Sequence, residues 1–349
     1  MRLGVNLGYW GAGNDAESLE LAREADRLGY SVAWVAEAYG SDAATVLAWI
    51  AAQTEQIDVG SAIFQIPGRT PALTAMTAAT LDTLSGGRFR LGLGVSGPQV
   101  SEGWHGVRFD KPLARTREYV EIVRKALARE KVVHDGEFFT LPLPDGPGKA
   151  LTLTVHPVRE RIPIYIAAIG PKNLELTGEI ADGWLAVFFA PEFAEELTSS
   201  LAAGRARAGR TMEGFDVVPT VPVVIGDNVA ACADAVRAYS ALYIGGMGSR
   251  EKNFYNRLVS RMGYEDAAAE VQEKYLARDY AGAGAAVPLE FIDRTALIGP
   301  RERIQERLHA YAEAGVTTLT LATYAGTIEQ RVATLRTMTE VLDASGLGE

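Results

Sequence analysis

The chain has 349 residues, of which 48% are hydrophobic, so it can bury a large core. Its formal net charge of −10 argues against unspecific binding to nucleic acid or to anionic membranes. A single cysteine, Cys232, excludes a disulfide framework and a thiolate metal cage. A strand-like segment stands at the N-terminus with no leader ahead of it, and no run approaches the roughly 18 apolar residues of a membrane span. We therefore expect a soluble, cytoplasmic protein.

Short apolar runs alternate with helical stretches along the chain. The expected strands cover residues 2–7, 31–36, 57–63, 89–95, 162–168, 183–188, 215–225 and 316–322. The expected helices cover residues 16–28, 42–53, 71–84, 111–129, 171–181, 191–208, 302–314 and 327–342. Eight strands that alternate with helices predict an α/β fold, the (β/α)8 TIM barrel. A doubly wound sheet is the competing architecture, because Gly92, Gly94 and Gly97 follow a strand. The residues after Gly97 indicate a loop, however, and not the helix that such a motif requires.

Two segments exceed a minimal barrel, and we expect them as insertions at its C-terminal face, within a single domain that spans residues 1–349. Residues 132–156 indicate an extended excursion with a hairpin-like turn. Residues 245–293 indicate helices between glycine-rich joints, at residues 245–248 and 281–286. The larger insertion is either a movable cover or a surface elaboration, and the sequence leaves both open.

In a barrel, the reactive site gathers at the carboxyl ends of the strands. This rule selects small and aromatic residues with one carboxylate, which suit a flat heterocycle lying across the barrel mouth. The residues are Asn6, Gly8, Tyr9, Trp10, Glu37, Ala38, Tyr39, Gly40, Ser61, Ala62, Ile63, Gln65, Gly94, Ser96, Gly97, Ala168, Gly170, Pro171, Lys172, Thr323 and Tyr324.

The side chains that other chemistries require are missing. Only four histidines occur, and none has a partner at metal-ligand spacing, so we expect no metal site. The sequence contains no GxSxG, HExxH or phosphate-binding GxxxxGK motif. Ser61 has no histidine near it in sequence to activate it, which disfavours a hydrolase. We expect a cofactor, and not a side chain, to perform the chemistry.

The chain resembles the luciferase-like flavin and deazaflavin oxidoreductases over nearly its whole length. The segments that carry the resemblance are residues 35–42, Ser61-Ala62-Ile63, Leu84-Ser85-Gly86-Gly87-Arg88, and residues 94–99, 170–173 and 181–184. The resemblance implies coenzyme F420, a 5-deazaflavin, as cofactor. It implies hydride transfer between the deazaflavin C5 and a small organic substrate, which is a carbonyl, alcohol, enone or imine. The alternatives are an FMN-dependent luciferase-like monooxygenase and a non-catalytic flavin-binding subunit. A homodimer is also implied.

The resemblance also assigns roles to individual residues. It implies a non-prolyl cis peptide at Ala62–Ile63 beneath the cofactor rings, and Glu37 as general acid/base or as a hydrogen-bond partner of the cofactor. Many deazaflavin relatives carry histidine at the position of Ala38, so a proton-donating role of that histidine is absent or moved here. A structural carboxylate, paired at the strand end, is the alternative for Glu37. The helix start at Gly170 favours an anion and is assigned the cofactor phosphodiester.

The expected cofactor-binding residues are Asn6, Glu37, Ser61, Ala62, Ile63, Gly94, Ser96, Gly97, Gly170, Pro171 and Lys172. Tyr9, Trp10 and Tyr39 are expected to stack on the substrate, and Trp104 and His105 to close the pocket. The candidates for an acidic polyglutamyl tail are Arg69, Arg250, Lys252 and Arg257.

Overall fold

A computed structural model describes residues 1–11, 15–323 and 326–349. Eight parallel strands close into a barrel in the order β1 (Arg2–Asn6), β2 (Val32–Val35), β3 (Asp58–Ser61), β5 (Phe89–Gly94), β8 (Ile164–Ala167), β9 (Gly183–Val187), β10 (Asp216–Ile225) and β12 (Thr318–Ala322). Strand β12 pairs with β1, so the ring of strands is complete. The prediction of a (β/α)8 barrel is confirmed, and the doubly wound alternative is wrong.

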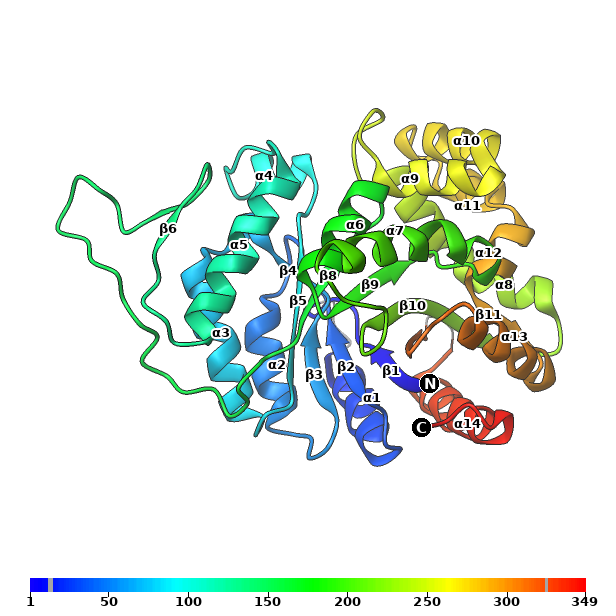
Figure 1. Ribbon diagram of the computed structural model, residues 1–349. Helices are drawn as coiled ribbons and strands as arrows, with labels where there is room; N and C mark the ends of the chain where they lie inside the picture. The colour runs from blue at the N-terminus through cyan, green and yellow to red at the C-terminus, as the bar shows by residue number, and fades with distance from the viewer. Residues whose placement is uncertain (12–14, 324–325) are drawn as a thin grey trace.

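Helices surround the barrel (Figure 1). They are α1 (Asp15–Arg27), α2 (Ala43–Ala51), α3 (Pro71–Leu84), α5 (Pro112–Leu127), α6 (Pro171–Ile180), α7 (Ala194–Arg207), α8 (Val229–Ala241), α13 (Arg301–Glu313) and α14 (Ile328–Ser345). Helix α4 (Pro98–Gly103) begins directly after Gly97, so the expected loop there is wrong. Proline at the first helical position accounts for this start. Closure of the sheet, and not the segment after Gly97, is therefore what excludes a doubly wound fold. Two short strands were not expected, β4 (Phe64–Gln65) beside β5 and β11 (Leu297–Gly299) beside β10.

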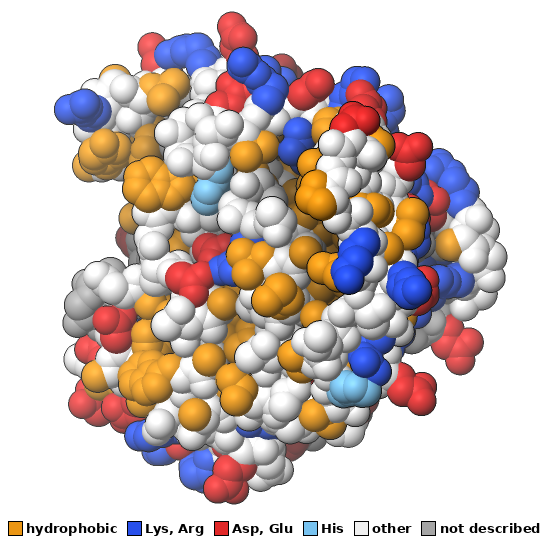
Figure 2. All heavy atoms as spheres, turned by 90° about the vertical axis from the view of Figure 1, so that its left-hand side faces the viewer, with side chains coloured by type: hydrophobic (Ala, Val, Ile, Leu, Met, Phe, Trp, Pro, Cys, Tyr) orange, Lys and Arg blue, Asp and Glu red, His pale blue; other side chains and the backbone are white. Residues whose placement is uncertain are grey.

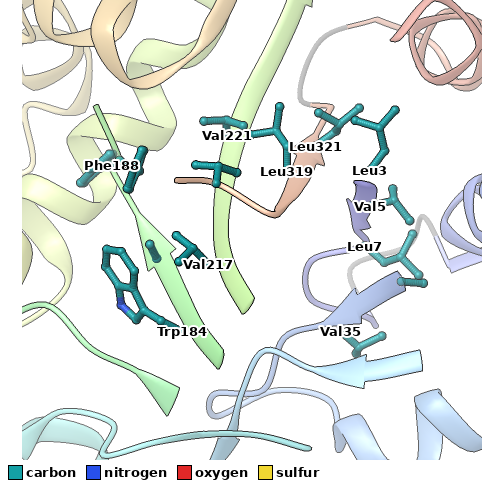
Figure 3. Packing of buried hydrophobic residues seen from close by; sticks show 14 of the residues in the cluster. Leu3, Val5, Leu7, Val35, Trp184, Phe188, Val217, Val221, Leu319 and Leu321 are labelled. Atoms are coloured by element: carbon teal, nitrogen blue, oxygen red, sulfur yellow. The ribbon is translucent and has the colours of Figure 1, made fainter. Parts of the chain in front are cut away.

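Alternate residues of the strands form two separate hydrophobic layers, because side chains in a strand point to opposite faces. Val32, Trp34, Tyr165, Leu185 and Val218 form the smaller cluster, and the larger cluster joins the strands to the helices. Figure 3 shows part of the larger cluster, in which residues of β1, β9, β10 and β12 pack together. Burial on both faces explains why the strands are near-continuous apolar runs.

The Ser85-Gly86-Gly87-Arg88 segment is a turn that joins α3 to β5. Gly86 and Gly87 have φ angles of 66° and 88°, a region that favours glycine. The Arg88 guanidinium donates hydrogen bonds to the carbonyl oxygens of Ile57 and Ala51, at 2.5 and 3.0 Å. This turn lies at the amino end of the strands, away from the carboxyl ends. The segment that carried much of the resemblance therefore stabilises the fold and does not line the site.

The excursion at residues 132–156 extends along the outer side of α5 (Figure 1), with the two-stranded hairpin β6 (His134–Asp135) and β7 (Thr140–Leu141) in it. Glu118 of α5 accepts hydrogen bonds from the N–H groups of Glu137, Phe138 and Phe139, at 2.9, 3.0 and 3.1 Å. The excursion leaves from the amino ends of the strands, because it follows a barrel helix. It then returns along α5 toward the carboxyl ends (Figure 1), where Lys111 forms an ion pair with Glu137 and Arg115 lies over the Phe138 ring.

The second insertion consists of short helices above the carboxyl ends of the strands (Figure 1). They are the π-helical turns η3 (Leu242–Gly246) and η4 (Ser260–Tyr264), and the helices α9 (Phe254–Val259), α10 (Glu265–Leu276), α11 (Tyr280–Ala286) and α12 (Leu289–Thr295). Residues 281–286, expected as a flexible joint, belong to helix α11. Asp279 caps this helix by accepting a hydrogen bond from the Gly282 N–H at 2.8 Å, which explains the difference. No helix within the described residues is long and apolar enough to cross a membrane.

Candidate active site

The main chain bulges out of the barrel wall between β3 and β4. Strand β3 pairs with β5 as far as Gly60, and β4 resumes the pairing at Phe64. The peptide bond between Ala62 and Ile63, in the gap, is cis, as the resemblance implied. Ala62 and Ile63 are partly exposed and pack on the smaller hydrophobic cluster inside the barrel. These two residues therefore form a floor at the carboxyl end of the barrel.

Two glycines of β5 make room for the bulge. A Cβ at Gly92 would overlap the carbonyl oxygen of Ser61, and a Cβ at Gly94 would lie 2.5 Å from Ile63 Cδ1. The glycine spacing of β5 therefore reflects the shape of the neighbouring chain and not a phosphate loop.

The bulge also determines the role of Ser61. The Ser61 hydroxyl accepts a hydrogen bond from the Gly92 N–H at 2.9 Å and donates one to the Gly92 carbonyl at 2.8 Å. Ser61 has an exposed fraction of 0%, and Gly94 is buried behind Ile63. The expected cofactor contacts of Ser61 and Gly94 are therefore corrected: both residues support the floor from behind.

Glu37 follows β2 and is held by an ion pair. Its Oε1 accepts hydrogen bonds from Arg69 at 3.0 Å and from the Ala43 N–H at 3.2 Å, and its Oε2 accepts one from the Gln65 N–H at 3.3 Å. The Glu37 and Arg69 side chains are 10% and 12% exposed. Burial opposes the charge of Arg69, but the carboxylates of Glu37 and Asp42 outweigh it and raise the pKa of Arg69. Arg69 is thus engaged with these carboxylates, which corrects its assignment to a polyglutamyl tail.

Gln65 connects the bulge to the next loop. Its side chain donates a hydrogen bond to the Ala38 carbonyl at 2.6 Å and accepts one from the Ser96 hydroxyl at 3.0 Å. Ser96 has a φ angle of 60°, and Gly97 after it is the N-cap residue of α4. On the β1 side, Asn6 Oδ1 accepts a hydrogen bond from the Gly8 N–H at 2.9 Å. Asn6, Glu37, Ser96 and the floor residues therefore lie on neighbouring strand ends, as predicted, and Gln65 joins them in a role that the sequence did not indicate.

Helix α6 begins at Gly170 with Pro171 in its first turn, and no side chain caps it. No atom lies within 4 Å of the position that a Cβ of Gly170 would take. Lys172 is exposed beside this start. Uncapped N–H groups at a helix start attract anions. The arrangement fits the anion site that we expected at Gly170, Pro171 and Lys172.

The predicted aromatic residues separate into buried and exposed groups. Trp10 is 7% exposed, and its ring packs edge-on against Trp49 of α2 at a centroid distance of 5.5 Å. Its expected stacking on a substrate is therefore corrected, because the ring belongs to the core. Tyr9 is 43% exposed, whereas Tyr39 and Trp104 are both 68% exposed. His105 packs against Gly68, and its Nε2 is buried with no hydrogen-bond partner among the described residues.

A cluster of aromatic residues at the base of the second insertion was not predicted. Phe188, directly after β9, contacts the rings of Tyr239, Tyr243 and Tyr255 at centroid distances of 5.9, 5.9 and 6.4 Å. Burial raises the pKa of the Tyr255 hydroxyl. Only the spacing of Tyr239 and Tyr243, four residues apart on one helix face, could have indicated this cluster.

Two remaining expectations concern strand β12 and metals. Thr323 is buried and accepts a hydrogen bond from Arg331 at 3.2 Å, and Tyr324 lies outside the described residues. Across the part of the chain that the structure describes, no group of three or more His, Cys, Asp or Glu side chains could hold a metal ion.

Comparisons with known proteins agree with this geometry. Residues 7–318 match the family model described as luciferase-like monooxygenase. The Mycobacterium tuberculosis protein Rv3520c, named provisionally as a coenzyme F420-dependent oxidoreductase, is 44% identical over 337 residues, which cover 95% of this chain and 96% of that protein. The 5,10-methylenetetrahydromethanopterin reductase of Archaeoglobus fulgidus is 30% identical over 299 residues, which cover 84% and 85%.

Two solved structures share the fold. The coenzyme F420-dependent tetrahydromethanopterin reductase from Methanopyrus kandleri has a TM-score of 0.82 at 23% identity and covers 97% of each chain. An F420-dependent secondary alcohol dehydrogenase, solved with an F420–acetone adduct, has a TM-score of 0.79 at 18% identity and covers 99% of this chain and 98% of that one. The chain belongs to the luciferase-like monooxygenase family.

Proposed function

We propose that this chain is a coenzyme F420-dependent oxidoreductase that transfers a hydride between the deazaflavin and a small organic substrate, a carbonyl, alcohol, enone or imine. The observation that carries the proposal is the main-chain bulge at residues 61–63, because it gives the barrel mouth a partly exposed floor with two glycines behind it. The name of the M. tuberculosis relative supports the choice of F420. When bound, the cofactor supplies the redox chemistry, with the hydride on its C5.

The residues at the mouth fit a flat cofactor that carries a phosphodiester. Ala62 and Ile63 would lie beneath its rings, and the uncapped start of α6 at Gly170 would hold the phosphodiester, with Lys172 as an added positive charge. Asn6, Ser96 and Gly97 lie around the same opening. The contribution of these residues is orientation: they hold the cofactor and the substrate at reacting distance.

That Glu37 takes part in catalysis remains a prediction. Its contacts support a positioning role. Both carboxylate oxygens already accept hydrogen bonds, from Arg69, Ala43 and Gln65. Gln65 in turn holds Ser96. We infer that Glu37 acts as a positioning residue, which orders the loops on both sides of the floor, and not as a free acid or base.

A titration of the purified protein with oxidised F420 and, separately, with FMN tests the cofactor. We expect the absorption spectrum of F420 to change on binding, with weaker or no binding of FMN. Tight binding of FMN alone would favour the monooxygenase alternative and contradict the proposal. A protein that binds F420 and exchanges a hydride with no member of a panel of carbonyls, alcohols, enones and imines would be a binding subunit.

We also propose a homodimer. Exposed hydrophobic side chains support it. Helix α3, the excursion and the segment directly after it carry Met76, Leu84, Leu143, Leu151 and Val158 at 54–68% exposure. Figure 2 shows the face to which the excursion belongs, with hydrophobic side chains among charged ones. Light scattering should give twice the chain mass, and Met76→Glu with Leu84→Glu should shift the protein toward the monomer. A monomeric wild type would contradict the proposal.

A further inference from the structure

The aromatic cluster at the base of the second insertion lies across the barrel mouth from the floor. In the ring of eight strands, β10 is four positions from β3 in either direction, so the two are diametrically opposed. The floor residues Ala62 and Ile63 follow β3. Tyr239 and Tyr243 lie on α8 and η3, which follow β10. A substrate above the floor therefore has these tyrosines as its opposite wall.

Tyr243 lies in the π-helical turn η3, where helix α8 passes into the insertion. Such turns are rare and are often found at functional sites. The Tyr243 ring is packed on three sides, at centroid distances of 4.7 Å from Tyr239, 4.9 Å from Tyr255 and 5.9 Å from Phe188. These contacts fix the ring, so the position of its hydroxyl is determined by the fold.

The Tyr243 hydroxyl is hydrogen-bonded to the hydroxyl of Tyr9, which reaches it from the loop after β1. Tyr9 is 43% exposed, so part of its side chain is accessible at the mouth. Partial burial and the neighbouring Tyr39 raise the pKa of Tyr9, and the hydrogen bond with Tyr243 opposes the rise. The phenol is therefore protonated at neutral pH and can donate a hydrogen bond.

We propose that Tyr9 donates a hydrogen bond and then a proton to the oxygen atom of a carbonyl substrate, and that Tyr243 positions the Tyr9 hydroxyl for this step. The inference rests on the proposed function and narrows its substrate class to ketones and aldehydes, or to the corresponding alcohols in the reverse direction. No histidine follows Glu37 at this mouth, and Glu37 itself is paired with Arg69.

The chemical balance requires a proton at this place. Reduction of a carbonyl adds a hydride to the carbon, breaks the C=O π bond and leaves negative charge on the oxygen. The hydride would come from reduced F420, the reductant that the proposed function implies, with its oxidation balancing the reduction of the carbonyl. The Tyr9 proton passes to the oxygen to complete the alcohol, and Tyr9 regains a proton from solvent through Tyr243. A donor at the position where the charge develops stabilises the transition state more than the bound substrate.

The experiment measures oxidation of reduced F420 by acetone, cyclohexanone, acetophenone and benzaldehyde, with wild type, Tyr9→Phe, Tyr243→Phe and the double variant. We expect Tyr9→Phe to lower kcat about 100-fold with KM changed less than threefold, as for loss of a general acid. Tyr243→Phe should lower kcat about tenfold. The double variant should be no slower than Tyr9→Phe, because both residues act through one hydroxyl.

Tyr280→Phe is the matched control. Tyr280 lies on α11, is 56% exposed, and contacts Tyr275 at a centroid distance of 4.8 Å. The kcat of Tyr280→Phe should stay within twofold of the wild-type value. All variants should bind oxidised F420 with dissociation constants within twofold of wild type, which excludes misfolding as the cause of a loss.

Three outcomes would overturn the inference. The first is wild-type kcat in Tyr9→Phe, and the second is a double variant whose loss equals the product of the two single losses. The third is a wild type that binds F420 but reduces no carbonyl of the panel and oxidises none of the corresponding alcohols. In each of these the cofactor proposal survives. Absence of F420 binding in the titration is the separate result that overturns the proposed function.

Discussion

The Ser61 hydroxyl replaces a missing strand partner for Gly92. It accepts a hydrogen bond from the Gly92 N–H and donates one to the Gly92 carbonyl, at 2.9 and 2.8 Å, where the bulge has moved the main chain of β3 away from β5. Both groups are buried, and a buried backbone group without a partner costs free energy. A serine at this strand end is therefore what allows the floor of the site to leave the sheet without exposing the wall behind it.

Substitution of Ser61 by alanine should destabilise the fold. Ser61→Ala leaves the Gly92 N–H and carbonyl unpaired, and we expect the free energy of unfolding to fall by about 1–3 kcal/mol. Urea denaturation checks this value. Ser199→Ala, which removes an exposed hydroxyl bonded to a carbonyl of α7, should change it by less than about 0.5 kcal/mol. Equal stability of Ser61→Ala and wild type would contradict the role assigned to the hydroxyl.

Substitution of Gly92 by alanine should deform the floor. The added Cβ would overlap the Ser61 carbonyl oxygen, which is backbone and cannot rotate away. We expect F420 affinity to fall at least tenfold, together with a lower melting temperature, because the bulge must shift. Gly103→Ala is the control, since no atom lies within 4 Å of the position of its Cβ. Unchanged affinity in Gly92→Ala would show that the floor does not support the cofactor.

Neutralising Glu37 should slow turnover more than it weakens cofactor binding. Glu37→Gln keeps the shape of the side chain but removes the charge that holds Arg69. We expect kcat to fall at least tenfold and the F420 dissociation constant to change less than threefold. Glu37→Asp, which keeps the charge, should recover part of the loss. If Glu37→Gln retains wild-type kcat and only melts at a lower temperature, Glu37 is purely structural.

The pH dependence of stability should show the contribution of Glu24. Hydrogen bonding to Arg27 lowers the pKa of Glu24 to about 2, with burial opposing and Arg336 of α14 adding to the effect. A pKa that is lower in the folded state stabilises the fold above the unfolded value, near 4.5, and this stability is lost as the pH falls toward 2.

Glu24→Gln tests that contribution. At pH 7 the variant should be less stable than wild type by about 1 kcal/mol, the upper range for partly exposed pairs. Urea denaturation at pH 7, 4 and 3 should show the difference shrinking with acidity. Glu195→Gln, which changes an exposed carboxylate of α7, should follow the wild-type curve at every pH. A constant difference between Glu24→Gln and wild type would contradict the linkage.

The sequence predicted the barrel because its strands are buried on both faces and therefore stand out as apolar runs. It failed where a capping residue overrode composition. Residues 281–286 are rich in glycine and alanine, and Asp279 nevertheless starts a helix there. The sequence prediction also failed at helix α4, a short helix that begins at Pro98 where a loop was expected. The point where the excursion leaves the barrel follows from connectivity, since it comes after a helix. Its return along α5 depends on Glu118 and Lys111, which no local pattern links to residues 137–139.

The site could be predicted only in part, because strand ends specify position and not orientation. Trp10 and Tyr9 are neighbours after β1. Trp10 is nevertheless buried against Trp49 of α2, whereas Tyr9 is exposed at the mouth. Ser61 was placed correctly at its strand end, but its hydroxyl faces Gly92. Tyr243 and Tyr255 belong to an insertion, and the rule that places site residues at the strand ends of a barrel does not cover insertions. Their contacts with Phe188 are therefore seen only in the structure.

Helix α5 anchors the base of the excursion. Glu118 accepts hydrogen bonds from the N–H groups of three successive residues, and the rings of Phe138 and Phe139 contact Arg115 and Tyr119. Residues 143–149, by contrast, are all exposed. A recognition loop or an affinity tag inserted there would therefore project from the molecule without displacing these anchors.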